Sequence, residues 1–263
     1  MRRSLAVAAS LVCAFALRAE RIELAEGDST CVVDTFGARV VSCKAHGQEL
    51  LWTPETGVVR DPVWSHGGIP VVWPWFGRLG EGVKDIHGYA WKNEFAVRAR
   101  SKSSLTLALE TESASLEVEI RLGAELALSL RTTNRSRFPA PFAFGFHPYF
   151  RVGERDRTVV EGVKDEPMRI TGAIDGATAY DAPESRREYR IRDEALGRTI
   201  RIAAENLTAV NVWNPDVLEC PGVIPSDAWR HFVAVEPIAR GFNRFLVLGP
   251  GQTHVLRMSV AAE

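Results

Sequence analysis

The chain has 263 residues, of which 46% are apolar and 25% charged, with 32 basic against 33 acidic side chains. This near-zero net charge argues against a nucleic acid or an anionic membrane as the main partner, since both attract basic surfaces. The length suits one large all-β domain or two smaller ones, and a small neutral molecule is the expected ligand.

The N-terminus resembles an export signal. Two arginines precede the apolar run 5–17, which is too short to span a bilayer comfortably, and residues 14–16, Ala-Phe-Ala, form a small-x-small cleavage sequence. A buried N-terminal helix or a misassigned start would produce the same pattern. We expect a signal peptide over 1–19 and a single domain over 20–263. The protein is then exported, periplasmic or secreted, or cytoplasmic if the start is misassigned.

The cysteines allow one disulfide once Cys13 is removed with the signal. Cys31 and Cys43 lie symmetrically about Gly37, so a hairpin turning there places them opposite each other on adjacent strands. A disulfide needs Cα atoms within about 7 Å. A bulge would break this symmetry, and the alternative is two buried thiols. Cys220 would remain unpaired, and the absence of a CxxC motif argues against a cysteine zinc site.

Alternation of apolar and polar residues, typical of half-buried strands, dominates the rest of the chain. In chain order, we expect strands at 40–43, 95–100, 105–112, 115–122, 124–134, 199–205, 232–236, 244–250 and 254–260. Gly, Asn, Asp and Pro separate them, and long helical periodicity is lacking. The polar stretch 180–197 is expected to form an excursion and turns. The pattern predicts a large all-β antiparallel β-sandwich.

Residues 67–91, GGIPVVWPWFGRLGEGVKDIHGYAW, combine a stiff backbone with aromatic rings beside a histidine. Pro70 and Pro74 each remove a backbone donor and fix φ, and Gly88 permits a tight turn next to His87. Such a segment suits the wall of a pocket for a flat, hydroxylated ligand. The alternative is a proline-kinked edge strand that packs its aromatic rings into a core.

Two further residues are suited to proton transfer. His147 lies in the aromatic run FAFGFHPYF, and Glu236 follows the apolar run FVAV. An imidazole and a buried carboxyl form a general acid–base pair. The alternatives are a core histidine and an edge carboxylate paired with Arg240. GxSxG, GxxxxGK[ST] and HExxH are absent and the histidines show no close-spaced ligand pair, so no metal is expected.

The motifs GGIPVVWPWFG, HGYAWKN, FHPYFRVGE, VNVWNP and FVAVE resemble, in this order, those of the hexose-6-phosphate mutarotase (glucose-6-phosphate 1-epimerase) family, a branch of the galactose-mutarotase-like superfamily. The resemblance implies a β-supersandwich that interconverts the α and β anomers of a hexose or hexose 6-phosphate without a cofactor. By resemblance, Glu236 is the base that takes the C1 hydroxyl proton, and His147 is the acid that protonates the ring oxygen. His87 helps to hold and polarise the ring-oxygen region.

The resemblance also implies substrate contacts. The candidates are Trp73, Trp75, Phe76, Trp91 and Trp213 for aromatic surface, Asn214 for a hydroxyl and Arg78 for a phosphate. The family commonly has arginine, a candidate phosphate contact, where this chain has Trp91, and often HTYF where this chain has Pro148. Arg78, Arg186 and Arg187 are candidate replacement cations, because arginine presents a fork of donors to phosphate.

We expect a monomer that binds a sugar or sugar phosphate, with no nucleic acid and no membrane association beyond the export signal. Export favours free sugars or oligosaccharide ends, because sugar phosphates are mainly intracellular. A non-catalytic carbohydrate-binding protein on the same scaffold is the main alternative, since fold does not fix function. A related lyase or hydrolase would need another acid or base, for which only Asp181, Glu184 and Asp216 are available.

Overall fold

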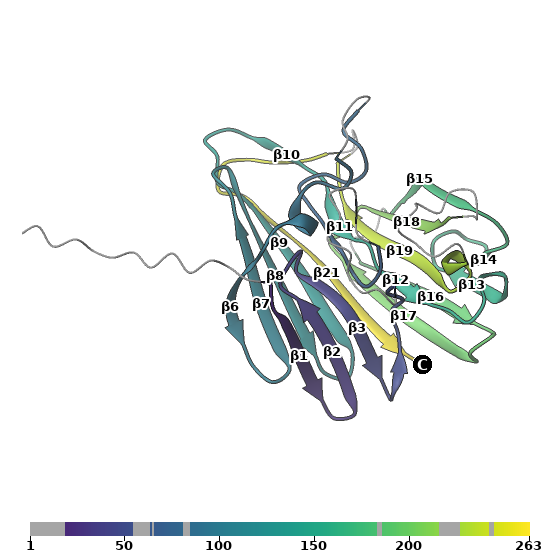
Figure 1. Cartoon of the computed structure of the whole chain (residues 1–263). Helices are drawn as coiled ribbons and strands as arrows, with labels where there is room; N and C mark the ends of the chain where they lie inside the picture. The colour runs from purple at the N-terminus through teal and green to yellow at the C-terminus, as the bar shows by residue number, and fades with distance from the viewer. Residues whose placement is uncertain are drawn as a thin grey trace, which may run out of the picture.

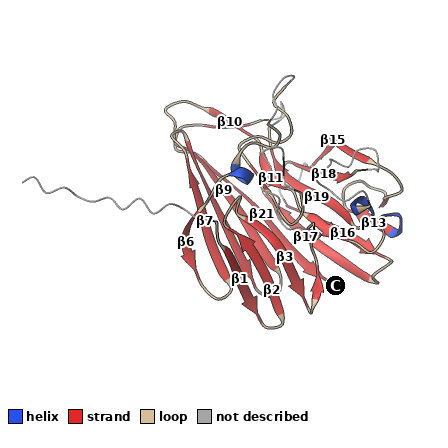
Figure 2. Ribbon diagram, viewed as in Figure 1, coloured by secondary structure: helices blue, strands red, loops and turns tan. Residues whose placement is uncertain are grey.

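The computed structural model describes residues 19–54, 64, 66–80, 85–182, 186–215, 227–241 and 245–263, without the side chains of 175–178 and 186. The expected signal peptide lies outside them except for its last residue, as do Cys13, Cys220, Glu184 and Asp216. Strands dominate (Figure 2), which confirms the predicted all-β class. The helices among these residues are single 3-10 turns: η1 (Ala90–Lys92), η2 (Arg155–Arg157) and η3 (Ala228–Arg230). None of these described helices has the length and apolar character needed to cross a membrane.

The largest sheet has nine antiparallel strands (Figure 1). Its strands, in spatial order, are β14 (Met168–Arg169), β13 (Thr158–Glu161), β16 (Arg186–Asp193), β17 (Arg198–Glu205), β21 (Thr253–Ala262), β9 (Leu126–Asn134), β8 (Ala114–Leu122), β7 (Ser104–Glu110) and β6 (Ala96–Arg100).

Three smaller sheets complete the described structure. A four-stranded sheet contains β1 (Arg21–Glu26), β2 (Ser29–Asp34), β3 (Arg39–Ala45) and β4 (Gln48–Glu49). A six-stranded sheet has the order β15 (Ile174–Asp181), β18 (Ala209–Asn214), β19 (Phe232–Ala239), β11 (Phe144–Phe146) and β5 (Val71–Val72), and β12 (Tyr149–Arg151) also pairs with β19. A two-stranded sheet joins β10 (Ala140–Phe142) to β20 (Leu246–Leu248).

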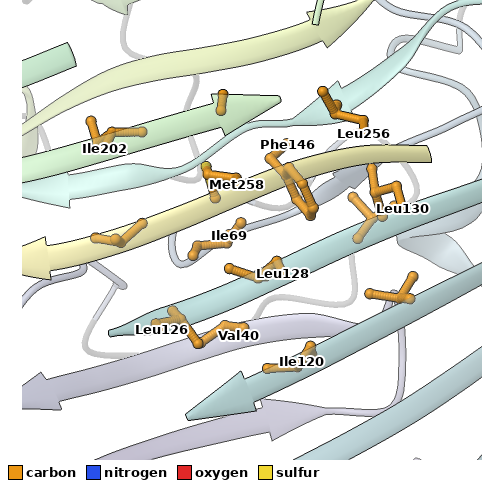
Figure 3. Packing of buried hydrophobic residues seen from close by; sticks show 14 of the residues in the cluster. Val40, Ile69, Ile120, Leu126, Leu128, Leu130, Phe146, Ile202, Leu256 and Met258 are labelled. Carbon is orange, nitrogen blue, oxygen red and sulfur yellow. The ribbon is translucent and has the colours of Figure 1, made fainter. Parts of the chain in front are cut away.

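The hydrophobic core lies between the nine-stranded sheet and the sheets that face it. β1 and β2 contact β8, and β19 contacts β21. Apolar side chains from both layers meet there: Figure 3 shows Val40 and Ile69 near Leu126, Leu128 and Met258. In β8, buried residues alternate with exposed or half-buried polar and charged ones, as expected for a sheet with one face in solvent.

The strands predicted from alternation are present. The expectation of an excursion and turns over 180–197 is wrong for 180–181 and 186–193, which are strand, whereas 194–197 do form a turn. This stretch contains the end of β15 and all of β16, which pairs with β13 and β17. Tyr189 and Ile191 are buried, while Glu188 and Arg192 point to solvent. Every second side chain therefore enters the core, and the many charges that suggest a loop occupy the outer face.

Cys31 and Cys43 form the disulfide that the spacing predicted. The β2–β3 register pairs them directly, although a bulge between Val32 and Val33 shifts the pairing nearer the turn. Both cysteines are buried in the core. Nearer the turn, Val33 pairs with Val40, a register that would place Ser42 opposite Cys31. The bulge adds one residue to β3 and so brings Cys43 opposite Cys31.

The segment 67–91 contains the edge strand that was one of its two predicted roles, while its role as a pocket wall stays a prediction. Val71–Val72 form β5 at the edge of the six-stranded sheet, and Trp73 is fully buried. The chain then folds back, so that Trp73 forms an isolated β-bridge with Gly88. Gly88 has φ of +71°, and a Cβ atom there would lie 2.0 Å from the carbonyl oxygen of Trp73, so only glycine fits. This turn presents His87.

Candidate active site

Three neighbouring strands bring Asn211, Glu236 and His147 into one row. The β18–β19 register pairs Asn211 with Glu236. On the other side, β11 and β12 pair with β19 in one continuous register, so His147, between them, comes opposite Glu236. Nε2 of His147 lies 3.6 Å from Oε2 of Glu236, and Nδ2 of Asn211 donates to Oε1 of Glu236 at 3.2 Å. A carboxyl and an imidazole that are far apart in the chain thus form a close pair.

Glu236 lies inside a strand in which every residue is buried, and its own exposure is 0%. It is therefore not an edge carboxylate, and Arg240 instead pairs with Asp181 at 3.5 Å. Burial raises the pKa of Glu236 to about 8, because a carboxylate loses its hydration there, while the hydrogen bond from Asn211 acts in the opposite direction. The carboxyl can hold a proton at neutral pH and release it to a base close by.

His147 is also buried, with an exposure of 5%. Burial lowers its pKa well below the ordinary value, and the neighbouring imidazoles of His87 and His66 act in the same direction. Among the described residues, Nδ1 of His147, Oε2 of Glu236 and Oδ1 of Asn211 have no hydrogen-bond partner, although all three are buried. Because buried polar groups normally have partners, this row is suited to a ligand that both donates and accepts hydrogen bonds.

His87 adopts a left-handed backbone, with φ of +61°, which is uncommon for a residue other than glycine. The Gly77 N–H donates to its Nδ1 at 3.2 Å, so a neutral ring carries its proton on Nε2. The pKa of His87 is lowered to about 3. Burial is the largest cause, and the charges of His66 and Arg78 act in the same direction. Its ring meets that of His147 edge to face, with centroids 5.3 Å apart. The second predicted histidine thus lies beside the first.

Three residues that the sequence analysis did not single out complete the cluster. The ring of Trp64 lies 4.6 Å from that of His87 and 5.6 Å from that of His147. Its indole N–H donates to the Tyr149 hydroxyl at 3.2 Å, and Nδ1 of His66 lies 2.9 Å from the same hydroxyl. Tyr149 stacks on His147 at 4.8 Å. Tyr149 could have been found, because residues two apart in a strand share a face.

Some of the predicted substrate contacts reach this cluster. Phe76 lies edge to face against His87 at 5.0 Å, and Trp213 lies 5.7 Å from His147. Arg78 is exposed and forms a bridge with Ile86, next to His87. These three residues remain candidates for contact with a ligand.

Other predicted contacts lie elsewhere. Trp73 is core, and Trp75 packs edge to face against Tyr89 at 5.8 Å. Trp91 is 2% exposed and lies 5.2 Å from Trp64, and its indole N–H donates to the carbonyl of Gly88 at 3.1 Å. Trp91 therefore packs against the ring of Trp64, and its indole N–H is already used within the protein. Arg187 lies in β16 of the nine-stranded sheet, whereas His147 lies between β11 and β12 of the six-stranded sheet.

The assignment of Asn214 as a hydroxyl contact is also corrected. Asn214 is 0% exposed and donates to the backbone carbonyls of Trp229 and Phe232 at 2.8 and 2.7 Å. Its Oδ1 accepts from Arg155 at 3.3 Å. All three contacts hold the chain after β18. Asn211 reaches the site instead, because it shares a face with Trp213, while position 214 points the other way.

The described side chains include no group of three or more His, Cys, Asp or Glu arranged to hold a metal ion. The arrangement is a buried carboxyl–imidazole pair, flanked by a second imidazole and by aromatic faces. It can take a proton from one oxygen of a ligand while it gives a proton to another.

Comparison with known proteins matches residues 20–181 to the family model "Aldose 1-epimerase". "Putative glucose-6-phosphate 1-epimerase" of Escherichia coli (strain K12) is 26% identical over 224 residues, which cover 76% of each chain. The protein of the same name in Salmonella typhimurium is 26% identical over 228 residues, or 77% of each chain. The crystal structure of "a putative mutarotase (YeaD)" from Salmonella typhimurium superposes with a TM-score of 0.80 at 22% identity, covering 93% of this chain and 90% of that one.

A "galactose mutarotase related enzyme" from Lactobacillus acidophilus gives a TM-score of 0.73 at 16% identity, covering 93% of this chain and 97% of that one. At such identities, the solved structures establish the shared fold. The family model covers more than half of the chain and includes His87 and His147. The chain therefore belongs to the aldose 1-epimerase family.

Proposed function

We propose that the protein is a hexose 1-epimerase that interconverts α and β anomers by opening and reclosing the pyranose ring at Glu236 and His147. The observation that carries the proposal is the 3.6 Å separation of the two buried groups in a chain of this family. A general acid and a general base at this spacing can act on the two oxygens that share the anomeric carbon.

In the forward step, the Glu236 carboxylate takes the proton from the C1 hydroxyl. The C1–O5 bond breaks, its electron pair moves to O5, and Nε2 of His147 supplies the proton that O5 requires. The open-chain aldehyde then rotates about the C1–C2 bond. In the reverse step, His147 takes the proton back, O5 adds to the other face of C1, and Glu236 returns its proton to O1. The protein ends in its starting protonation state.

The pair works with one proton in total. The ionised form, Glu236 carboxylate with His147 imidazolium, opens the ring, and the neutral form that remains afterwards closes it. Both forms have the same number of protons, so the apparent pKa values are properties of the pair and not of either residue alone. Burial favours the neutral form in the free site, since it disfavours both charges. Activity is therefore expected at pH values where the pair retains its single proton.

The surrounding residues bind and orient the sugar in this proposal. His87 offers its Nε2–H beside His147, in the region assigned to the ring oxygen. Trp64, Phe76 and Trp213 supply aromatic faces against which the C–H faces of a sugar can pack. Arg78, exposed next to His87, is the candidate contact for a phosphate. A free hexose uses the inner groups alone, and a hexose 6-phosphate would also use Arg78.

The test is relaxation of pure α-glucose and of pure α-glucose 6-phosphate, followed by polarimetry or by exchange NMR at high protein concentration. Acceleration of either anomer pair is the expected result, and the ratio of the two rates reports the preferred substrate. If neither sugar, nor galactose or mannose, exchanges faster than in buffer, the proposal is wrong. Saturable sugar binding without exchange would then indicate a carbohydrate-binding protein on the same scaffold.

A further inference from the structure

Asn211 has no part in the scheme above, yet its placement is specific. It is 3% exposed, and its Nδ2 donates to Oε1 of Glu236 at 3.2 Å. Among the described residues, it is the side chain that donates a hydrogen bond to this carboxyl. Its own Oδ1 is buried and has no hydrogen-bond partner among those same described residues. An acceptor left in this state is costly unless a ligand donates to it.

The order of the three residues matches the order of atoms in a pyranose. Asn211, Glu236 and His147 lie on successive strands β18, β19 and β11–β12. In the sugar, C1 lies between C2 and the ring oxygen. If His147 serves the ring oxygen and Glu236 serves the C1 hydroxyl, then C2 lies on the side of Glu236 that faces Asn211.

We propose that Asn211 has two roles in the epimerisation proposed above, on which this inference rests. As a positioning residue, it holds Oε1 of Glu236, so that Oε2 faces His147 and the substrate. As a substrate contact, it accepts a hydrogen bond from the C2 hydroxyl with Oδ1. The site therefore selects hexoses with a free C2 hydroxyl over 2-deoxy hexoses.

The positioning role changes the titration of the acid–base pair. Within the part of the chain that the structure describes, the other titratable groups that face Glu236 are His147 and Tyr149, from β11–β12. His87 and His66 lie beyond them, and Arg39 is buried behind His66, where it donates to the His66 carbonyl at 3.4 Å. None of these contacts involves Asn211, so we expect them to persist when it is replaced. Loss of its amide donor raises the pKa of Glu236, so the pair keeps its proton to higher pH, and the ionised form that opens the ring becomes scarcer.

Two variants separate the roles. Asn211→Ala removes the donor and the acceptor. Asn211→Asp keeps an acceptor oxygen of the same shape and replaces the amide donor with a second carboxyl, whose like charge beside Glu236 also raises the pKa of the pair. With glucose and 2-deoxyglucose as probes in exchange NMR, the wild type should prefer glucose by on the order of tenfold in kcat/KM, the size of one hydrogen bond. Asn211→Ala should lose this preference and shift the alkaline limb of the pH profile upward. Asn211→Asp should shift the limb but keep the preference.

Asn214→Ala is the matched control, since this asparagine of the same strand holds only protein atoms. It should lower Tm without moving the alkaline limb or the preference for glucose. An Asn211→Ala protein that retains both the limb and the preference of the wild type would overturn the proposal. The same holds if the Asn214→Ala protein reproduces both changes.

A second measurement does not depend on turnover. With ¹³C-carboxyl-labelled glutamate, the Glu236 signal is assigned by its loss in Glu236→Gln, and its titration midpoint is followed by NMR. A higher midpoint in Asn211→Ala supports the positioning role even if no sugar is epimerised, in which case the proposed function alone fails. An unchanged midpoint refutes the positioning role, whatever the activity.

Discussion

Oε2 of Glu236 and Nε2 of His147 lie 3.6 Å apart, in a part of the core where both side chains are almost completely removed from solvent. Their burial sets their protonation, because each group is more stable uncharged in such surroundings. Their separation sets their chemistry, because one pyranose can present the C1 hydroxyl to one group and the ring oxygen to the other.

Removal of either group should abolish most of the activity. Glu236→Gln keeps the shape of the side chain and an acceptor for Asn211, but it cannot take a proton. His147→Ala removes the acid. Each general acid–base contribution is typically worth about 10²–10⁴-fold in rate. The kcat measured by exchange NMR should therefore decrease by a factor of that size in each variant. Glu117→Gln, on the exposed face of β8, is the control and should keep the wild-type rate. A fully active Glu236→Gln or His147→Ala protein would show that the roles are misassigned.

The activity should decline on the alkaline side of pH 8. The working form of the pair carries one proton, and burial raises the pKa of Glu236 to about 8, so this proton is lost as the pH rises through that value. The acid limb lies well below neutrality, because burial lowers the pKa of His147. The measurement is kcat/KM from pH 4 to 10. A rate that still rises between pH 8 and pH 10 would contradict the one-proton scheme.

Stability should be greatest near pH 6.5. The pKa values of His66 and His87 are lowered to about 3 and that of His147 is also lowered, so between pH 3 and 6.5 the unfolded chain binds protons that the folded chain does not. Stability therefore rises with pH in that window, by up to about 1.4 kcal/mol per pH unit and per group. Glu236 acts with the opposite sign: its raised pKa stabilises the fold at low pH, and this contribution is lost between pH 4.5 and 8.

Above pH 6.5 only the effect of Glu236 remains among these four groups, so the free energy of unfolding should fall between pH 6.5 and 8. Denaturant titrations across this range check the slope. Glu236→Gln cannot ionise and should flatten the decline. If the wild type and Glu236→Gln show the same slope, the carboxyl is not protonated in the folded protein at neutral pH.

Gly88→Ala should destabilise the protein strongly. The new Cβ would lie 2.0 Å from the Trp73 carbonyl oxygen, at φ of +71°, so the backbone that presents His87 must move. We expect a loss of more than about 3 kcal/mol in the free energy of unfolding. Gly197→Ala is the matched control, because φ there is +62° but no atom lies within 4 Å of the new Cβ. It should cost only about 1–2 kcal/mol, the penalty of the left-handed backbone. Equal losses in the two variants would show that the contact with Trp73 is not decisive.

Arg78 should decide how well a phosphorylated hexose is used. Its exposed guanidinium lies next to His87, and a guanidinium suits a phosphate because it offers paired donors. In Arg78→Gln, the ratio of kcat/KM for glucose 6-phosphate to that for glucose should fall by about tenfold at low salt, and high salt should reduce the difference. An unchanged ratio would show that Arg78 does not contact the phosphate.

The sequence by itself predicted the all-β class, nine of the strands and three candidate site residues. Alternation revealed the β-sandwich, because a strand with one face in the core repeats every two residues. His87, His147 and Glu236 stand out in their motifs, and Cys31 and Cys43 have the spacing of a hairpin pair. The same two-residue alternation is present in β16, but it is hard to recognise in the sequence because charged residues surround the buried Tyr189 and Ile191.

Only the tertiary structure decided which residues meet. The strand register puts Glu236 between Asn211 and His147, whereas a shift of one residue would turn each side chain to the opposite face. The tertiary structure also shows that the side-chain N–H groups of Asn214 and Trp91 already donate hydrogen bonds to backbone carbonyls. It adds Trp64 and His66 to the cluster around His147. A motif can predict that a side chain is special. Whether that side chain is free to contact a ligand depends on packing between strands that are far apart in the chain.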